Sequence, residues 1–457
     1  TPAKVGVLDM HTFGGGLNLI QQDSGFQSIS LKLRGEDGKV YLFRSVNKDT
    51  KLFLPPDLQN TVAADIIQDQ ISSSNPAGAL IVDVLADALH VLHPKPLLVL
   101  LPEGERLGRF KDSFAGMLGI IEEYPTADEN GFAGSDSILT TIKFFDALVN
   151  DNRNVVDACA FLTARLLDVF VGDWDRDFDR WRWARFKKTT NDVWFPIPMN
   201  RDEAFSRFDG VFPKIGSASA MQFDDRIRHI SNLIFAGRFI DRRLLVSLDK
   251  HAWDSVATSV TAALTDEVIE HAVKRMPPEF YNLRGEWLTR ALKSRRNNIK
   301  KAADEYYAFL AEYVDVHLSD LPELVEVKRL DDERVEVVAH RKKPTGSPGA
   351  EVFSRVFRAD ETKEIRIFLS GGDDKCVVRG DVETSIVIRV VGGDGNDEFV
   401  DESVVHGVLW GIVPFIPQAE RSTFFYDDEG RNTFVEGPSS SVDTTVSIPP
   451  PIGLRQY

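Results

Sequence analysis

The spacing of apolar residues changes twice along the chain, and this order limits the folds that the chain can adopt. Over the first 50 residues, apolar and polar residues alternate in short runs separated by Gly and Asp, as in β-strands. From about 136 to 320 apolar residues recur at helical spacing, and from about 322 strand-like runs return. We therefore predict an α+β protein with a β-rich unit containing one helix at 1–125, a helical unit at 126–320 and a small β-domain at 321–457.

Individual elements can also be predicted from these patterns. We expect strands at 17–22, 28–33, 39–46, 97–101 and 117–124. We expect helices at 79–89 and 157–171. The basic residues of the helical region 278–314 are interpreted as a solvated helix face. In the β-domain, Gly-Gly-Asp-Asp at 371–374 recurs as Gly-Gly-Asp-Gly, 21 positions later (392 − 371). This echo predicts two stacked rungs, fewer than a long solenoid needs.

The composition excludes some classes of function. The 457 residues carry a formal net charge of −16, which argues against a nucleic-acid-binding surface and against binding to anionic membranes. A nucleotide is compatible with this charge, because metal ions and a few basic residues can offset phosphate. No apolar run predicts a membrane-spanning helix, and Cys159 and Cys376 are interpreted as packed free thiols. Because the sequence starts without Met, we expect it to be part of a longer polypeptide.

An acidic break follows the buried helix predicted at 157–171. Four acids lie within seven residues, and they repel one another unless a cation or an arginine compensates: Asp173, Asp175, Asp177 and Asp179. One interpretation is a surface loop capped by Arg176 and Arg180, but the aromatic residues on either side make a plain surface loop a poorer explanation. We predict that Asp175 is a catalytic carboxylate that orients an attacking hydroxyl.

A second acid, Asp202, follows the strand-like segment 193–198. It lies 27 positions after Asp175 (202 − 175), a gap that accommodates an inserted hairpin. The structural alternative for Asp202 is a helix N-cap. Phosphoryl transfer needs metal-binding carboxylates beside the residue that orients the acceptor. We therefore predict that Asp202 holds Mg²⁺ or Mn²⁺, with help from Asp179 or Asp173.

These motifs resemble a known group of enzymes. Gly-Asp-Trp-Asp-Arg at 172–176 is similar to the catalytic loop of atypical kinases, namely the secretory-pathway, HipA-type and spore-coat CotH-type kinases. Together with Arg-Asp-Glu-Ala-Phe at 201–205, the chain more closely resembles a bacterial envelope family that is often fused to a calcineurin-like phosphoesterase and an outer-membrane barrel. The resemblance implies a bilobal kinase-like fold, with a small antiparallel β N-lobe and a large helical C-lobe. It also implies a place in the periplasm or at the cell surface, with the cytoplasm as the alternative.

The resemblance further implies an ATP site, with ATP bound together with Mg²⁺ or Mn²⁺. The residues implied for the phosphate-covering turn are Gly25, Gln27 and Ser28. Arg44 or Lys48, at the end of the third strand, would meet the phosphates, and Asp69 would pair with that cation. The segment from Glu122 to Tyr124 would be the hinge that meets the base through its backbone.

Three departures from the family pattern leave two functions open. Arg44 stands where these kinases have Lys, Asp177 replaces the usual His, and Arg180 occupies the position of a second metal ligand. One reading is a metal- and ATP-dependent phosphotransferase with an unknown acceptor, which transfers either phosphate or nucleotide. The alternative is a catalytically inactive pseudokinase that serves as an envelope scaffold or interaction module.

Two further motifs give weaker predictions. Residues 392–400 fit a calcium-binding nonapeptide, with Asp394 and Asp397 as candidate ligands. Because only a partial second copy exists, the sequence favours a strand–turn–strand over bound Ca²⁺. Asp9 and His11 match the start of calcineurin-like phosphoesterases, yet the His motifs that a dinuclear site needs do not follow. A metallophosphoesterase-related hydrolase is therefore the second alternative function.

Overall fold

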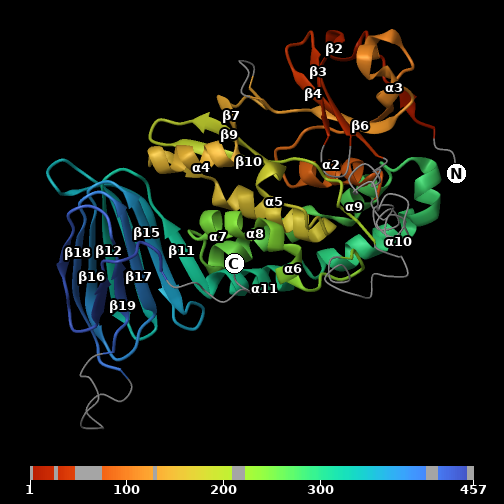
Figure 1. The fold of residues 1–457 in the computed structure, drawn as a ribbon. Helices are drawn as coiled ribbons and strands as arrows, with labels where there is room; N and C mark the ends of the chain where they lie inside the picture. The colour runs from red at the N-terminus through yellow and green to blue at the C-terminus, as the bar shows by residue number, and fades with distance from the viewer. Residues whose placement is uncertain are drawn as a thin grey trace, which may run out of the picture.

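The computed structural model describes residues 4–24, 29–46, 75–126, 131–207, 222–407 and 420–449. Figure 1 shows three parts in chain order: a small sheet lobe at the top, a helical lobe in the centre and a β-domain at the left. The predicted α+β class and the order of the lobes are confirmed. No helix in the described ranges is long and apolar enough to cross a membrane.

The N-terminal lobe is a six-stranded sheet in the order β1-β5-β6-β4-β3-β2, antiparallel apart from the β1–β5 pair. Its strands are β1 (Gly6–Val7), β2 (Leu17–Ser24), β3 (Ile29–Gly35), β4 (Val40–Ser45), β5 (Leu97–Leu100) and β6 (Leu118–Glu123). One face buries an apolar core that includes Leu31, Phe43 and Ile121, which the short helices η3 (Glu105–Phe110) and α3 (Lys111–Phe114) cover. Strands β2 to β6 were predicted within two residues of their ends, from short apolar runs between turn residues and, in β3, from the alternation of apolar and polar residues.

The other face of this sheet looks toward the helical lobe. Ile120 of β6 belongs to the core of the helical lobe, and so does helix α2 (Gly78–Ala88), which lies between β4 and β5 in the sequence. Gly78 lies so close to the helical lobe that a Cβ atom on it would stand 3.2 Å from the carbonyl oxygen of Ala204. The helix of the β-rich unit therefore packs as part of the helical lobe.

The helical lobe is built around α5 (Ala158–Val171), which is almost wholly buried. Asp157 caps its first turn by accepting a hydrogen bond from the Ala160 amide, and Gly172, with φ of 70°, ends it in the left-handed conformation. The other helices of this lobe are α4 (Thr141–Asn150), α6 (Ile230–Leu233), α7 (Arg238–Leu245), α8 (Lys250–Ala263), α9 (Asp266–Val273), α10 (Pro278–Arg296) and α11 (Ile299–Ala311).

A four-stranded sheet lies on the helical lobe in the order β7-β9-β10-β8. Its strands are β7 (Ser137–Thr140), β8 (Asn154–Val156), β9 (Trp181–Lys187) and β10 (Asp192–Pro198). Strands β9 and β10 form an antiparallel hairpin between the two predicted acidic loops. Trp183 of this hairpin stacks on Phe144 at a centroid distance of 4.1 Å, which anchors the hairpin in the core. The inserted hairpin expected from the spacing of Asp175 and Asp202 is present.

One basic residue of α10 does not lie on a solvated face. Arg295 is 2% exposed and donates to the carbonyl oxygens of Val169 and Phe170, each at 2.7 Å. Arg295 therefore gives the carbonyls of the last turn of α5 side-chain donors, in addition to the Gly172 amide that Val169 accepts at 3.3 Å. Arg290 of the same helix is exposed, as predicted. The prediction of a solvated basic face was wrong for Arg295, because periodicity does not show which arginine meets a helix end.

The β-domain consists of two packed sheets around one apolar core. The first sheet is wholly parallel, with β11 (Tyr313–His317), β15 (Glu364–Gly371), β17 (Val387–Asp394), β19 (Thr423–Tyr426) and β21 (Ser440–Asp443). The strands of the second sheet follow the order β14 (Pro348–Arg358), β13 (Arg334–Lys342), β12 (Glu323–Asp331), β16 (Lys375–Val382), β18 (Glu398–Val405) and β20 (Thr433–Val435). Strands β14, β13 and β12 form an antiparallel meander, and β12, β16, β18 and β20 run parallel to one another. Strand β11 begins inside the range predicted for the helical unit.

From β15 onward the chain alternates between the two sheets, so the β-domain winds as a short parallel solenoid. The prediction of only two stacked rungs was wrong, since the first sheet alone stacks five parallel strands. Ile365 pairs with Ile388 and Cys376 with Phe399, a repeat of 23 residues (388 − 365). The 21-residue echo of Gly-Gly-Asp therefore does not mark the stacking register, and the later rungs carry no such echo.

Replacing Arg295 by Met should lower the free energy of unfolding of the helical lobe by about 2–4 kcal/mol, because buried carbonyls at the end of α5 lose their donor. Urea unfolding followed by tryptophan fluorescence measures this change. Arg290→Met, at an exposed position of the same helix, is the matched control and should change stability by less than about 0.5 kcal/mol. Equal effects of the two substitutions would contradict the capping role.

Candidate functional site

The first acidic loop starts where α5 ends. Gly172 is required there, because its φ of 70° favours glycine and a Cβ atom would stand 3.0 Å from Phe223. Asp175 is half-buried, and its Oδ2 atom accepts a hydrogen bond from Nη2 of Arg180 at 2.5 Å. Asp177 and Asp179 lie further along the loop, with Asp179 exposed to solvent. The predicted catalytic carboxylate is thus held by a guanidinium in this structure.

Arg176 fastens this loop to the second acidic loop. Its buried guanidinium donates to the carbonyl oxygens of Met199 at 2.8 Å, Asn200 at 2.9 Å and Arg180 at 3.1 Å. The face of the guanidinium also lies 4.8 Å from the ring of Trp181. Asp175 and Asp202, distant in sequence, are therefore carried by two loops that one arginine ties together.

The second loop, residues 199–205, is strained at both ends. Asn200 and Phe205 have φ of 54° and 62°, which cost energy for residues other than glycine. The Phe205 amide donates to the carbonyl of Val171 at 2.9 Å, so the loop returns to the end of α5. Asp202 lies between these anchors, partly exposed, and among the described residues no hydrogen bond engages its carboxylate. The surroundings therefore fix the backbone of the loop while the Asp202 carboxylate stays available.

Beneath both loops lies the carboxylate of Asp168, which sequence patterns did not predict. It is fully buried in α5 and accepts a hydrogen bond from Arg165 at 2.8 Å and another from Arg201. Nε of Arg176 lies 3.4 Å from it. Burial would raise the pKa of Asp168, but the three arginines outweigh that effect and hold the pKa below its usual value. Asp168 therefore stays ionised and joins three guanidinium groups.

Asp173, predicted as a helper of the metal, faces this arginine cluster. It is 2% exposed, and its Oδ2 atom lies 3.2 Å from Arg201 and 3.5 Å from Arg176. Burial raises the pKa of Asp173 to about 6, against the opposing effect of the two arginines. The Asp173 carboxylate therefore lies beneath the two acidic loops, buried against Arg176 and Arg201, and not on the side where Asp202 is exposed.

The N-terminal lobe supplies a cation from above. Arg44 of β4 and Glu122 of β6 form a buried ion pair at 2.6 Å on the sheet face that looks toward the helical lobe. Burial would lower the pKa of Arg44, but the carboxylates of Glu122 and Asp202 more than offset it and the pKa is raised. Arg44 and Asp202 thus interact across the two lobes. The sequence predicted Asp69 as the partner of this cation, but Glu122 is its partner among the described residues.

The predicted hinge extends beyond the end of the neighbouring strand β5. Strand β5 pairs with β6 only as far as Ile121, so Glu122 to Tyr124 have no strand on that side in the described part of the chain. The Tyr124 amide donates to the carbonyl of Val40 at 2.8 Å on the other side. The Tyr124 ring lies between Lys32 and Arg182, whose cationic groups are 5.1 and 5.2 Å from its centroid. The edge is compatible with the predicted contact to a base.

Several predicted site residues lie outside the described residues. These are Gly25, Gln27, Ser28, Lys48 and Asp69, so the phosphate-covering turn and the alternative cation stay predictions. Asp9, the start of the phosphoesterase-like pattern, accepts hydrogen bonds from the His11 amide and the Thr12 hydroxyl. It serves a local turn of the N-terminal lobe.

Arg180 links the acids electrostatically. Burial would lower its pKa, but the carboxylates of Asp175, Asp177 and Asp202 outweigh burial and raise it. Within the described ranges, no three acids of the interlobe region bring ligand atoms within 4.8 Å of one another. A metal in this region would therefore take one or two carboxylates and complete its shell with other ligands, such as phosphate oxygens.

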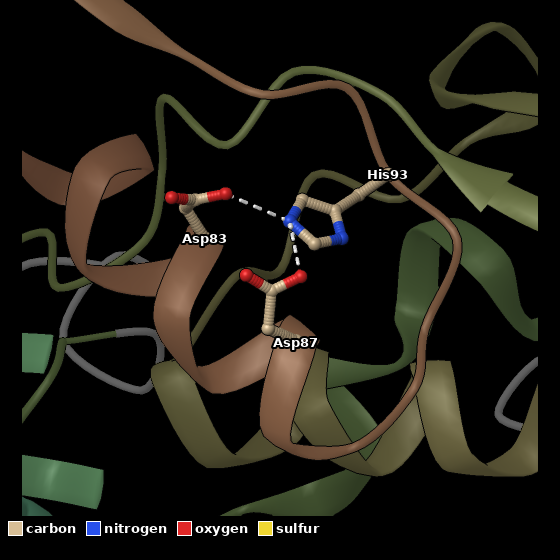
Figure 2. A group of neighbouring side chains, drawn as sticks. All are labelled: Asp83, Asp87 and His93. Carbon is tan, nitrogen blue, oxygen red and sulfur yellow. Dashed lines mark hydrogen bonds and ion pairs between the residues drawn. The ribbon is translucent and has the colours of Figure 1, made fainter. Parts of the chain in front are cut away.

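A group of metal-ligand type lies elsewhere, at the end of α2. Figure 2 shows Asp83, Asp87 and His93, whose ligand atoms lie within 4.8 Å of one another. Nε2 of His93 is 2.9 Å from Asp83, and Nδ1 is 2.7 Å from the carbonyl of Val91. The ammonium of Lys95 is ion-paired with both aspartates. Since a lysine already provides the cation, we interpret this group as an ion-pair network that holds the turn after α2.

Three solved structures of kinases are similar to part of this chain, at low identity and low TM-score. No family model matches the chain, and no curated protein matches it. The proinflammatory kinase CtkA of Helicobacter pylori is similar in structure, with 9% identity and a TM-score of 0.31 over 61% of this chain and 94% of CtkA. The Golgi casein kinase with Mn/ADP bound has 8% identity and a TM-score of 0.33 over 66% and 73%. HipA of Shewanella oneidensis MR-1 has 11% identity and a TM-score of 0.30 over 63% and 67%.

The fold is kinase-like. An antiparallel sheet lobe precedes a helical lobe, a cation on the third strand of the meander faces that lobe, and two acidic loops flank a hairpin below it. This order was predicted from the sequence and is confirmed. The envelope family, its fusion partners and the compartment stay predictions.

The pKa of Asp173 leads to a pH-dependent stability. With a folded pKa of about 6 and an unfolded pKa of about 3.9, its contribution is fully present below pH about 4 and is lost as the pH rises through 6. The melting temperature of Asp173→Asn should therefore depend less on pH than that of the wild type, over a range of about pH 4.5 to 7.5. Thermal unfolding across this range measures it. Asp177→Asn, at a half-exposed position, should follow the wild type, and parallel curves for Asp173→Asn would contradict the prediction.

Proposed function

We propose that this protein binds a nucleoside triphosphate with a divalent metal between its two lobes and transfers phosphate to an acceptor hydroxyl. The observation that supports this most is the meeting of charges from three separate segments. Arg44 comes from the sheet lobe, Asp175 with Arg180 from the loop after α5, and Asp202 from the loop after β10. A phosphotransferase needs this set of a cation, a metal-binding carboxylate and an orienting carboxylate.

The residues fit a hard divalent metal. Asp202 has an accessible carboxylate without a hydrogen-bond partner among the described residues, and Mg²⁺ or Mn²⁺ prefers such oxygen ligands. Mg²⁺ sites in kinases commonly use one or two carboxylates and complete the shell with water and phosphate oxygens. We assign Asp202 as the main ligand and the exposed Asp179 as the helper. The bound metal would neutralise charge on the phosphates.

The remaining residues act on position and charge. Arg44 would lie against phosphate oxygens, and its bond to Glu122 fixes the direction of the guanidinium. Asp175 would accept a hydrogen bond from the acceptor hydroxyl, provided that Arg180 leaves its present position. Arg180 can then turn to the phosphates, where a guanidinium offsets developing negative charge. The edge of β6 at Glu122 to Tyr124 would receive the base.

One observation favours an inactive scaffold as the second candidate. Arg180 lies 2.5 Å from Asp175, so the carboxylate that should receive the acceptor is neutralised by an ion pair. It also stands where the family has a second metal ligand. A protein that binds nucleotide but keeps this ion pair would hold the two lobes together without turnover.

Nucleotide binding tests the metal role of Asp202. Calorimetry should show that wild-type protein binds ATP in the presence of Mg²⁺ or Mn²⁺, and that Asp202→Ala weakens this binding at least about tenfold, or 1.4 kcal/mol. Without metal the two proteins should bind ATP to a similar extent, because the variant loses the metal ligand and keeps Arg44. Glu286→Ala, at an exposed position on α10, is the control.

No binding of ATP by the wild type would overturn the proposed function. Unchanged affinity in Asp202→Ala would overturn the metal role. The position of a radioactive phosphate in ATP distinguishes phosphate transfer from nucleotide transfer. Label from the γ-phosphate appears on the acceptor in phosphate transfer, and label from the α-phosphate appears there in nucleotide transfer. Nucleotide binding without transfer of either label to protein, lipid or glycan would support the scaffold.

Removing Arg180 should change metal and nucleotide affinity in opposite directions. In Arg180→Ala, a cation 2.5 Å from Asp175 disappears, so Mn²⁺ measured by electron paramagnetic resonance should bind several-fold more tightly. Metal-free ATP should bind more weakly, because a phosphate partner is lost. Arg185→Ala removes an arginine of β9 that pairs with Asp192, and it should leave both affinities unchanged. Weaker Mn²⁺ binding in Arg180→Ala would contradict this account.

A further inference from the structure

One end of the β-domain carries a row of stacked acidic residues. Four neighbouring parallel strands begin at or directly after one residue of this row, which consists of three acids and one amide: Glu323, Asp374, Asp397 and Asn432. The last three side chains each accept a hydrogen bond from the backbone amide of the residue before them in this row: Asp374 from Glu323 at 2.6 Å, Asp397 from Asp374 at 2.8 Å and Asn432 from Asp397 at 2.8 Å. These bonds use one oxygen of each side chain, which leaves the second oxygen of each acid for another partner.

Some of those second oxygens are buried without a partner. Oδ2 of Asp374 and Oδ2 of Asp427 are inaccessible and accept no hydrogen bond among the described residues, and both residues are 1% exposed. Asp427 follows β19 and lies at the same end of the domain. A buried carboxylate oxygen without a donor is costly, so these atoms point to a cation or a proton that the described residues do not supply.

Asp397 and Asp427 face each other across Gly392. A Cβ atom on Gly392 would stand 2.0 Å from Oδ2 of Asp427 and 2.9 Å from Oδ2 of Asp397. The two oxygens are therefore at most about 4.9 Å apart, and glycine is the residue that leaves them this space. Ca²⁺ binds oxygens at about 2.3–2.6 Å, so a single ion can reach both.

No described lysine or arginine forms an ion pair with Asp397 or Asp427. Lys375 pairs with Glu398, and Lys342 donates to the carbonyl oxygen of Asp373. Two facing buried carboxylates cannot both be ionised unless a proton or a cation lies between them.

We propose that Asp397 and Asp427 bind one calcium ion within the turns of the β-domain. Two hard carboxylate oxygens suit Ca²⁺, which prefers oxygen ligands and completes an irregular shell with carbonyl and water oxygens. Asp394, the partner of Asp397 expected from the sequence, is exposed, so Asp427 from the next rung takes its place. The ion would fasten the rung of β17 and β18 to the rung of β19 and β20. This site is independent of the interlobe site.

Thermal unfolding of the full chain tests the proposal. At pH 8 in a chelator, the melting temperature of the wild type should rise by at least about 3 °C on addition of excess CaCl₂, with a smaller rise for MgCl₂. Equilibrium dialysis with radioactive calcium should find one bound calcium ion per chain. Asp427→Asn should lose the shift, and its melting temperature in chelator should equal or exceed that of the wild type, because one of the two facing charges is gone.

Control variants separate this site from others. Asp428→Asn, at the exposed neighbouring position, and Asp202→Ala, in the interlobe site, should both keep the calcium shift. If Asp427→Asn does not fold, Asp397→Asn and the dialysis of wild-type protein decide the question. The proposal is overturned if the wild type shows neither a shift nor bound calcium, which means that a proton joins the pair. It is also overturned if Asp427→Asn keeps the full shift, and an equal shift with MgCl₂ overturns the choice of calcium.

Discussion

The rest of the helical lobe depends on the buried carboxylate of Asp168. A single negative charge in α5 joins the guanidinium groups of Arg165, Arg176 and Arg201, and each of these leads to another segment. Arg165 continues to Asp241 of α7, which accepts a hydrogen bond from Tyr306 of α11. Without Asp168, three buried cations would lose a shared counter-charge, and a buried charge without its partner is strongly destabilising. The positions of both acidic loops therefore follow from the placement of one carboxylate.

This arrangement separates support from chemistry. The arginines under the loops make short, geometrically fixed contacts to carbonyls and carboxylates, which suits a rigid planar guanidinium. Above them, Asp202 has no hydrogen-bond partner among the described residues, whereas Asp175 is joined to Arg180, which is one-third exposed. The two carboxylates differ in whether a residue already occupies them. A ligand can approach Asp202 directly, whereas Arg180 has to leave Asp175 before a ligand can bind there. Two of the three departures from the family pattern, Asp177 and Arg180, thus lie in the loop that carries Asp175.

Much of the fold could be predicted from the sequence because alternation and helical spacing are local signals. Strands β2 to β6, helix α5 and the two acidic loops were predicted near their observed positions. Asp168 could not be predicted, because a single acid within an apolar helix gives no sign of which arginines will reach it. Arg295 was misassigned for the same reason, and Glu122 was expected to act through its backbone although its side chain binds Arg44. The parallel solenoid was underestimated because stacking depends on rung length, which varies here between 17 (440 − 423) and 35 residues (423 − 388).

The near-contact of Gly78 with the loop that carries Asp202 ties α2 to that loop. A Cβ atom at position 78 would stand 3.2 Å from the carbonyl oxygen of Ala204 and 3.5 Å from that of Arg201, so the missing side chain eases this approach. Because α2 packs in the core of the helical lobe, the contact supports the loop from within the same lobe, beside Arg176. Arg44 belongs to the sheet lobe, so the position of Asp202 and that of the facing cation are governed by different parts of the chain.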